Sequence, residues 1–349
     1  MQYRKIHAEF YCGVDVHPKK SYLCILDKSG EKRLGLNLKN NFDNFKETVN
    51  PFLPNLAVGC ESTYAYYWLA DGCHKAGIQF YLGHAMYMKA ISGNKQKHDP
   101  LDAKTIANLL RTSFFPEAFP YPREMRATRD ILRRRHRLVR LRAEAFSHIQ
   151  MVAHQYCIED ITPKAVKDRK NRRDLIEQFN EQDLRDIISS DFDVIESLDP
   201  VIEELEIKIK ASAIHHDSSS FSLLKTTPGI GDMLALIILY ETHDIKRFPT
   251  PQRYSSYARV VKCDRTSAGK SVGSKNQKIG NPYLKWAFNS IIISAQQSSE
   301  RIGKYYRRLE SKYGRPRARA RIAHQFAISV YAMLKKQEPF SEERFFAGH

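Results

Sequence analysis

Short apolar runs separated by polar turns occupy the start of the chain. The segments FYCGVDV (10–16), SYLCILD (21–27) and KRLGLNL (32–38) are rich in aromatic, aliphatic and β-branched residues. The HPKK and KSGE stretches between them contain the Pro, Ser and Gly residues of tight turns. This pattern predicts three consecutive strands that form a meander.

Helical and strand patterns alternate along the next part of the chain. The sequence predicts a helix near 44–52, a strand at 56–62, a helix at 64–76 and a strand at 77–83. Residues 99–112 (DPLDAKTIANLLRT) then have apolar residues at helical spacing and a proline suited to a first turn. Together these elements predict a mixed α/β layer.

Long helical patterns begin at residue 123. Two of them, at 123–154 and 193–216, place apolar residues close to the spacing of a coiled-coil seam. We expect a polar, basic connector at 164–173 and an interruption of the second helix at Pro200. The seam positions are Leu138, Leu141, Ala145, His148 and Val152 in the first helix and Ile195, Leu198, Ile202, Leu205 and Ile209 in the second.

Length and composition allow several folded parts. The chain has 349 residues, 42% of them apolar, which is enough to bury a core. The predicted fold class is α/β plus α. We expect a mixed-sheet domain at 1–122, a helical coiled-coil region at 123–217 and a mainly helical domain at 218–349.

Positive charge exceeds negative charge by a wide margin. The chain holds 56 Lys and Arg against 39 Asp and Glu, a net charge of +17. This balance favours a nucleic acid over an acidic small substrate, with binding that weakens as salt rises. The sequence has neither a long apolar run nor a signal-peptide pattern, so we expect a protein of the cell interior without a membrane partner. The six scattered cysteines are expected to be reduced and mostly buried.

Four acidic residues lie where predicted elements begin or end. Asp15 and Glu61 close predicted strands, and Asp99 and Asp102 lie three apart on one face of a predicted helix. Carboxylates gathered in this way repel each other unless hard cations such as Mg²⁺ neutralise them, and a pair of such ions can clamp a phosphodiester. A simpler interpretation stays open, because aspartates at a helix start often only cap it or favour its dipole.

At these residues the sequence resembles the Piv/MooV-type DEDD transposases, the insertion-sequence family numbered one hundred and ten. The stretches that carry the resemblance are, in order, GVDVHPKK, GCESTYAYYW, KHDPLDAKTIANLL, TTPGIGDMLALIILYE, RFPTPQRYSSYARV and SAGKSVGSKNQKIGNPYLKWAF. The resemblance implies an N-terminal RuvC-like, ribonuclease-H-type domain, a coiled-coil middle and a C-terminal transposase domain. It also implies a catalytic site for Mg²⁺ or Mn²⁺ made of four acids, here Asp15, Glu61, Asp99 and Asp102.

The resemblance further implies a catalytic serine, which matches Ser267 in DRTSAGKS. A serine hydroxyl can attack a phosphodiester once a base or metal assists its deprotonation, and the phosphoserine retains the bond energy for rejoining. Ser271 is a weaker alternative nucleophile. Other implied properties are donor and target DNA as substrates, a structured guide RNA, and a homo-oligomer, dimer or tetramer, in which one subunit's acids meet another's serine. The implied location is the interior of a bacterial or archaeal cell, at the nucleoid when active.

Basic residues indicate where nucleic acid would bind. Residues 123–142 include nine arginines and two acids, more than solubility requires, although a solvated face is the alternative. The PGIG turn leads into a helix whose N-terminus could hold a phosphate, or it only joins two helices. Basic and amide residues after the serine are placed to hold the scissile phosphate. The candidates are Arg126, Arg129, Arg133, Arg137, Arg140, Gly229, Gly231, Lys270, Lys275, Lys278 and Asn281.

A second basic run, RIGKYYRRLESKYGRPRARARIAH, lies at 301–324 and contains Tyr305, Tyr306 and Tyr313. Their rings could stack on bases, but packing against a neighbouring helix is favoured.

Two other functions fit the same residues. One is a junction-resolving nuclease that hydrolyses DNA with metal-activated water and needs no serine. The other is a non-catalytic nucleic-acid-binding or RNA-packaging protein in which the acids are structural. The predicted function is a DNA transposase or recombinase of an insertion sequence.

Overall fold

The chain forms two compact units, Met1–Arg123 and Glu124–His349, called here the N-terminal and C-terminal units. The computed structural model describes residues 5–92, 98–159, 161–213, 217–261, 264–267, 270–274 and 279–347, of which 89–92, 213, 264–267 and 270–274 are described by their backbone alone.

A six-stranded sheet forms the centre of the N-terminal unit. Its strands are β1 (Phe10–Val16), β2 (Lys20–Asp27), β3 (Lys32–Lys39), β4 (Leu56–Glu61), β5 (Gln79–Gly83) and β6 (Glu117–Ala118). They lie in the order β3-β2-β1-β4-β5-β6. The first three pair antiparallel, so the predicted meander is confirmed. Because β4 pairs parallel with β1 and β5 parallel with β4, the carboxyl ends of these three strands meet at one edge.

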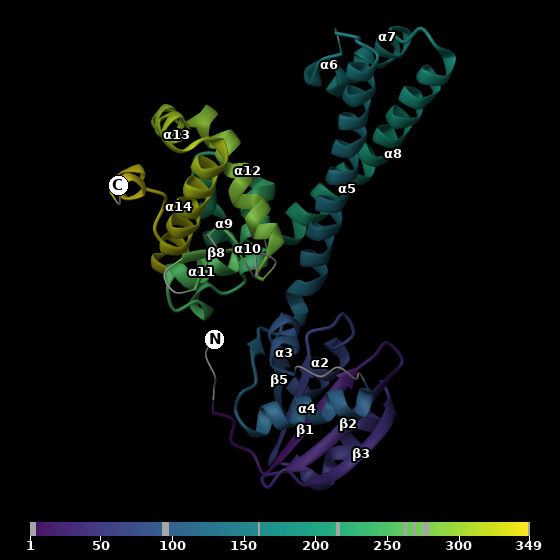
Figure 1. Ribbon diagram of the computed structural model, residues 1–349, viewed down its shortest axis with the longest axis vertical. Helices are drawn as coiled ribbons and strands as arrows, with labels where there is room; N and C mark the ends of the chain where they lie inside the picture. The colour runs from purple at the N-terminus through teal and green to yellow at the C-terminus, as the bar shows by residue number, and fades with distance from the viewer. Residues whose placement is uncertain are drawn as a thin grey trace. The chain divides into compact units, whose positions relative to one another are not determined.

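Helices cover both faces of this sheet. They are α1 (Phe42–Val49), the short η1 (Asn50–Phe52), α2 (Tyr67–Lys75), α3 (Ala85–Ser92) and α4 (Asp99–Arg111). Alternate residues of a strand point to opposite faces. Cys12 and Val14 of β1 pack with α1 and α2, whereas Tyr11 packs with Ile106 of α4. Figure 1 shows α4 lying across β1 and β2.

Two long helical arms open the C-terminal unit. They are α5 (Arg123–Gln155) and α8 (Gln182–Ala213), with α6 (Pro163–Lys167), η2 (Arg169–Asn171) and α7 (Arg172–Glu177) between them. The arms run side by side, with α6 and α7 at their shared end (Figure 1). Buried Ile149 and Val152 of α5 pack in one cluster with Ile188 and Ile195 of α8. The two arms therefore pair as a coiled coil would.

Two expectations for the arms are wrong. Pro200 does not interrupt α8, which continues through it. The side chain of the neighbouring Asp199 accepts hydrogen bonds from Arg142 and Arg169, which tie this part of α8 to α5 and to the connector.

The predicted seam of α5 is correct in part. Leu138, Ala145 and Val152 are buried as expected, whereas Leu141 is exposed and His148 lies 2.6 Å from Asp191. The polar, basic connector at 164–173 lies between the arms as expected and contains α6, η2 and the start of α7.

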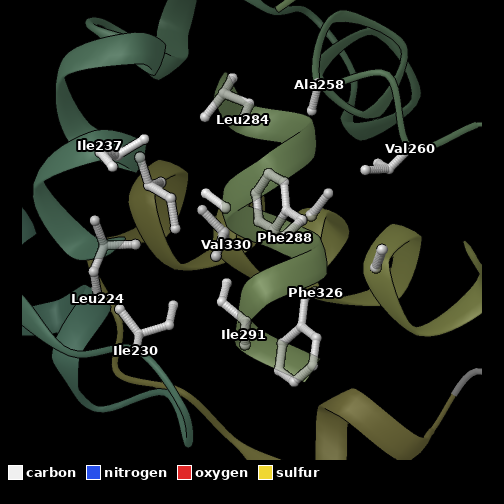
Figure 2. Packing of buried hydrophobic residues seen from close by; sticks show 14 of the residues in the cluster. Leu224, Ile230, Ile237, Ala258, Val260, Leu284, Phe288, Ile291, Phe326 and Val330 are labelled. Atoms are coloured by element: carbon white, nitrogen blue, oxygen red, sulfur yellow. The ribbon is translucent and has the colours of Figure 1, made fainter. Parts of the chain in front are cut away.

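The rest of the C-terminal unit is a helical bundle with one hairpin. Its elements are α9 (Ser218–Lys225), α10 (Asp232–Thr242), η3 (Ile245–Arg247), α11 (Pro251–Tyr257), β7 (Asp264–Ser267), β8 (Lys270–Ser274), α12 (Pro282–Ser298), α13 (Glu300–Tyr313), α14 (Arg315–Lys336) and α15 (Glu342–Phe346). Figure 2 shows Phe288 and Ile291 of α12 packed among Leu224, Ile237, Phe326 and Val330. This apolar cluster fixes α12 and α14 against each other.

The predicted fold class, a mixed-sheet α/β part followed by helices, is confirmed. The hairpin of β7 and β8 is the exception to the expected helical run at the end. Cys12, Cys24, Cys60 and Cys73 are free and buried as expected, whereas Cys157 is exposed and Cys263 lies outside the described residues. None of the helices in the described ranges has the length and apolar character needed to cross a bilayer.

Candidate active site

Two of the predicted metal ligands lie on adjacent parallel strands. Gly13 of β1 pairs with Gly59 of β4, so Asp15 and Glu61, each two residues further on, come to the same edge of the sheet. Side chains two apart on a strand share a face. Because Gly13 and Gly59 face α4, Asp15 and Glu61 also belong to the face that α4 covers.

Two glycines let α4 approach this edge. A Cβ on Gly13 would lie 2.0 Å from the carbonyl oxygen of Ala103 and 2.5 Å from the amide nitrogen of Ala107, both on α4. Gly59 faces Leu110 of the same helix, whose Cδ1 would lie 2.9 Å from such a Cβ. Since no other residue fits where backbone touches backbone, Gly13 sets how near the start of α4 comes to β1.

The start of α4 carries the other two acids. Asp99 and Asp102 lie in its first turn, where negative charge favours the positive end of the helix dipole. One oxygen of Asp15, one of Asp99 and one nitrogen of His17 all lie within 4.8 Å of one another. His17 Nε2 is 3.2 Å from Asp15 Oδ2 and 3.4 Å from Asp99 Oδ1. Glu61 and Asp102 are not part of this close group.

The electrostatics at Asp15 are those of a crowded acidic site. Its side chain is 17% exposed. Burial is the main cause that raises the pKa of Asp15, and the charges of Asp102 and Asp99 raise it further, while His17 opposes the shift. The net effect is a raised pKa, so ionisation of the Asp15 carboxyl group is less favourable in the folded chain than in water.

These residues suit a divalent cation. Carboxylate oxygens are the preferred ligands of Mg²⁺, and Mn²⁺ accepts an imidazole nitrogen as well. His17 lies between the carboxylates of Asp15 and Asp99, so its imidazole separates two groups that repel each other. A divalent cation held by Asp15 and Asp99, with Asp102 nearby, would place two positive charges among these carboxylates and relieve their repulsion.

His17 was missed as a site residue by sequence reasoning, which read HPKK only as a turn. The signal was present, because His17 stands two residues after Asp15, directly beyond the end of β1.

Comparison with known families decides the identity of the chain. Residues 12–158 match a family described as Transposase, the DEDD transposases of the IS110 type, and residues 221–307 match the Transposase IS116/IS110/IS902 family. The chain belongs to the IS110 family of DEDD transposases. A search of curated proteins gave no match. The first match spans the four predicted acids and the sheet that positions them, so this sheet is the RuvC-like part of the transposase.

The predicted nucleophile of the transposase lies in the C-terminal unit. Ser267 is the last residue of β7 and is paired in register with Lys270, the first residue of β8, while Ser271 is paired with Thr266. The backbone therefore places Ser267 and Lys270 together at the tip of a hairpin. Lys275 and Lys278 lie outside the described residues.

A buried ion-pair network accounts for three of the predicted nucleic-acid contacts. Glu241 of α10 is 3% exposed and accepts hydrogen bonds from Arg129 at 3.1 Å, from Arg133 at 2.7 Å and from Asn281 at 2.7 Å. Burial alone would raise the pKa of Glu241, but Arg133, Arg129 and Asn281 outweigh it and hold the pKa below its usual range. As the structure stands, these three side chains are engaged by the transposase itself.

Asn281 has a second task. Its side-chain oxygen accepts hydrogen bonds from the backbone N–H groups of Tyr283 and Leu284 and so caps α12. The segment that leaves the β7–β8 hairpin is therefore anchored to α10 and α5 through Glu241.

The remaining arginines of the predicted stripe differ in exposure. Arg137 and Arg140 are exposed, and Arg140 lies 3.6 Å from Glu144 on the same helix. Arg126 is half-buried. The continuous cationic stripe expected on α5 is thus divided, because residues four apart on a helix drift around it and Arg129 and Arg133 meet Glu241.

The PGIG turn is explained first by packing. Gly229 has a φ of +86° and touches α12, so a Cβ there would lie 2.5 Å from the backbone nitrogen of Ala295. Gly231 is exposed and precedes α10, but Asp232 occupies the first turn and pairs with Lys210 and Lys225. Packing against α12 thus accounts for the glycine at 229, and phosphate binding at Gly229 and Gly231 remains a prediction.

Proposed function

We propose that this transposase cuts and rejoins DNA with a divalent-metal site made of Asp15, Glu61, Asp99 and Asp102 and with Ser267 as the nucleophile. One observation carries the proposal. Asp15 and Asp99 are far apart in the sequence, yet both lie within hydrogen-bond reach of the Nε2 atom of His17. A carboxylate such as Asp15, whose pKa is raised by burial and by neighbouring acids, is typical of metal-dependent phosphoryl transfer sites.

In the proposed step, the Ser267 oxygen forms a bond to phosphorus while the bond between phosphorus and one deoxyribose oxygen breaks. The serine proton leaves to a base, and the departing deoxyribose oxygen gains a proton. When bound at the four acids, a divalent cation supplies charge stabilisation for the crowded phosphoryl oxygens. Attack by a deoxyribose hydroxyl of another strand then releases Ser267 and rejoins the DNA.

We further propose that the acids and the serine of one catalytic site come from different subunits of a dimer or tetramer. The family resemblance supports this assembly, as it supports a structured guide RNA that selects the donor and target DNA by base pairing. In that scheme the protein recognises the backbone and the shape of the duplex, which agrees with the net charge of +17. Its substrate would place the active protein at the nucleoid.

A second function has one observation in its favour. All four acids lie in the N-terminal unit, so hydrolysis by metal-activated water would need no residue of the unit that contains Ser267. A junction-resolving nuclease would work in this way.

Trapping of a covalent adduct separates the two functions. The full-length protein is incubated with DNA carrying the element ends, the transcribed flanking RNA and Mg²⁺, then denatured and run on a gel. We expect a protein–DNA adduct with the wild type and none with Ser267→Ala or Asp15→Asn, because each removes a required group. Ser271→Ala is the matched control and should keep the adduct.

Cleavage without an adduct, or an adduct that survives Ser267→Ala, would contradict the serine mechanism. The first result would favour the nuclease, and the second would point to another nucleophile such as Ser271.

A further inference from the structure

A large basic groove lies on the C-terminal unit. It has a volume of about 1110 Å³ and runs along the start of α14, with α12 and the residues before β7 as its other walls. Its charged members are Arg259, Lys285, Arg315, Arg317, Arg319 and Arg321. The apolar parts of the lining lie between side chains that carry only positive charge, so the groove suits a ligand with negative charge.

The charged side chains that line this groove in the described part of the chain are all basic. No Asp or Glu in the described part of the chain lines it. Arg315, Arg317 and Arg321 are exposed on α14, and Lys285 is exposed on α12. Like charges held in one groove repel each other. The arrangement therefore favours an anionic ligand that supplies several negative charges at once.

The position of these arginines on α14 disfavours a purely structural role. Arg315 and Arg317 lie in the first turn of the helix, which has no acid there and no side-chain cap from Gly314. Positive charge is unfavourable at the positive end of a helix dipole. By contrast, the preceding helix α13 has Glu300 in its first turn. The start of α14 thus gives up stability that an acid at the same place would provide.

One aromatic side chain orients an arginine of the groove. The guanidinium of Arg321 lies 4.0 Å from the centre of the Tyr313 ring, so its orientation is fixed before any ligand binds. Tyr305 and Tyr306, in contrast, are buried among α13 and α14, as packing predicted.

The groove is close in sequence to the proposed nucleophile. Arg259, Val260 and Val261 line it, and β7, which ends at Ser267, begins at Asp264. A ligand in the groove would therefore contact residues that stand shortly before the serine strand in the sequence.

We infer that this groove binds the sugar-phosphate backbone of one DNA strand, with Lys285, Arg317 and Arg321 as phosphate contacts, and feeds that strand to the hairpin of β7 and β8. The choice of DNA over other polyanions rests on the proposed function, since the strand attacked by Ser267 must reach that hairpin. Bidentate guanidinium contacts to phosphate suit a strand of any sequence.

The test compares two charge-matched double variants of the full-length protein. Arg317→Gln/Arg321→Gln lies in the groove, and Lys335→Gln/Lys336→Gln removes the same charge from exposed positions at the other end of α14. Binding of a labelled single-stranded DNA is measured by fluorescence anisotropy in EDTA over a range of salt, with an RNA of the same sequence as a second probe, and thermal unfolding checks folding.

The groove variant should bind DNA at least about tenfold more weakly at moderate salt, and its salt slope should fall by about 1.4, or 0.7 for each lost phosphate contact. Its Tm should stay the same or rise, because the helix start loses unfavourable charge. The lysine variant should keep the wild-type affinity and slope.

Equal losses in both variants would overturn the inference, since only net charge would then matter. Loss of RNA binding with unchanged DNA binding would overturn it as well. These outcomes are independent of the serine mechanism, because the measurement excludes metal and does not require Ser267. If the wild type forms the adduct but the groove variant binds DNA normally, only the groove inference is wrong. If the groove variant loses DNA binding but the wild type forms no adduct, only the serine mechanism is wrong.

Discussion

Glu241 shows how much one buried side chain can determine. Its carboxylate is surrounded by two guanidinium groups and the amide of Asn281, and burial leaves water no access to replace them. A buried pair of this kind adds little net stability relative to an apolar replacement, yet removing one partner leaves the other charges without compensation. Because Asn281 also caps α12, the network fixes the position of the residue at which α12 begins, after the β7–β8 hairpin.

Replacing Glu241 by Gln should therefore lower the free energy of unfolding by about 3–5 kcal/mol at neutral pH, because Arg129 and Arg133 lose their counter-charge. Urea unfolding measures the change. Glu300→Gln, which removes a surface acid paired with Lys304 in the first turn of α13, is the control and should cost about 1 kcal/mol or less. A similar loss of unfolding free energy in both variants would show that the Glu241 network contributes no more stability than a surface ion pair.

The lowered pKa of Glu241 adds a pH dependence with a fixed sign. The stabilisation is fully present above the ordinary carboxyl value of 4.5 and is lost as pH falls through the lower folded pKa. The wild type should therefore lose more stability than Glu241→Gln between neutral and acidic pH. Parallel pH profiles of the two proteins would contradict this assignment.

At this scale the sequence can identify residue types but not their partners. Arg129 and Arg137 occur in the same basic run, and only the fold reveals that Glu241, more than a hundred residues later, meets the first and not the second. Asp15 and Asp99 could be proposed as partners because strand ends and helix starts have predictable places. His17 could have been added to this site, because it stands only two residues after Asp15.

At the scale of elements, the contact of α4 with β1 matters most. This contact holds Asp99 and Asp102 beside Asp15, and it depends on the missing side chain of Gly13. The strands and helices of this unit could be predicted from local periodicity. The short β6, helix α3 and the passage of α8 through Pro200 could not, because each depends on packing against distant parts of the chain.

Gly13→Ala should separate α4 from β1. The added methyl group would collide with the backbone of Ala103 and Ala107, so we expect a loss of about 1–3 kcal/mol in unfolding free energy and loss of strand cleavage. Urea unfolding and a DNA cleavage assay measure the two effects. Gly77→Ala is the control, because its Cβ meets nothing within 4 Å and only its φ of +68° is strained.

The control should cost about 1–2 kcal/mol and keep activity. Full activity of Gly13→Ala would show that the spacing of α4 is not required.

At the scale of the whole molecule, an acidic cluster lies in a chain with a net charge of +17. Long-range attraction brings nucleic acid to such a chain, and the local negative charge calls for a cation before a phosphate can approach. The order of the motifs along the chain allowed this combination to be predicted. How the subunits assemble depends on surfaces that no motif describes.

Divalent-cation binding tests the central claim most directly. Wild type, Asp15→Asn and Glu9→Gln, a control that removes an exposed acid of the same unit, are titrated with Mn²⁺ and Mg²⁺ by calorimetry and thermal unfolding. We expect wild type and Glu9→Gln to bind the cation and gain stability, by about 2.7 kcal/mol at a hundredfold excess over Kd. Asp15→Asn should show neither effect and should be the more stable protein without metal, because repulsion is relieved. Equal metal binding by Asp15→Asn and Glu9→Gln would contradict the account.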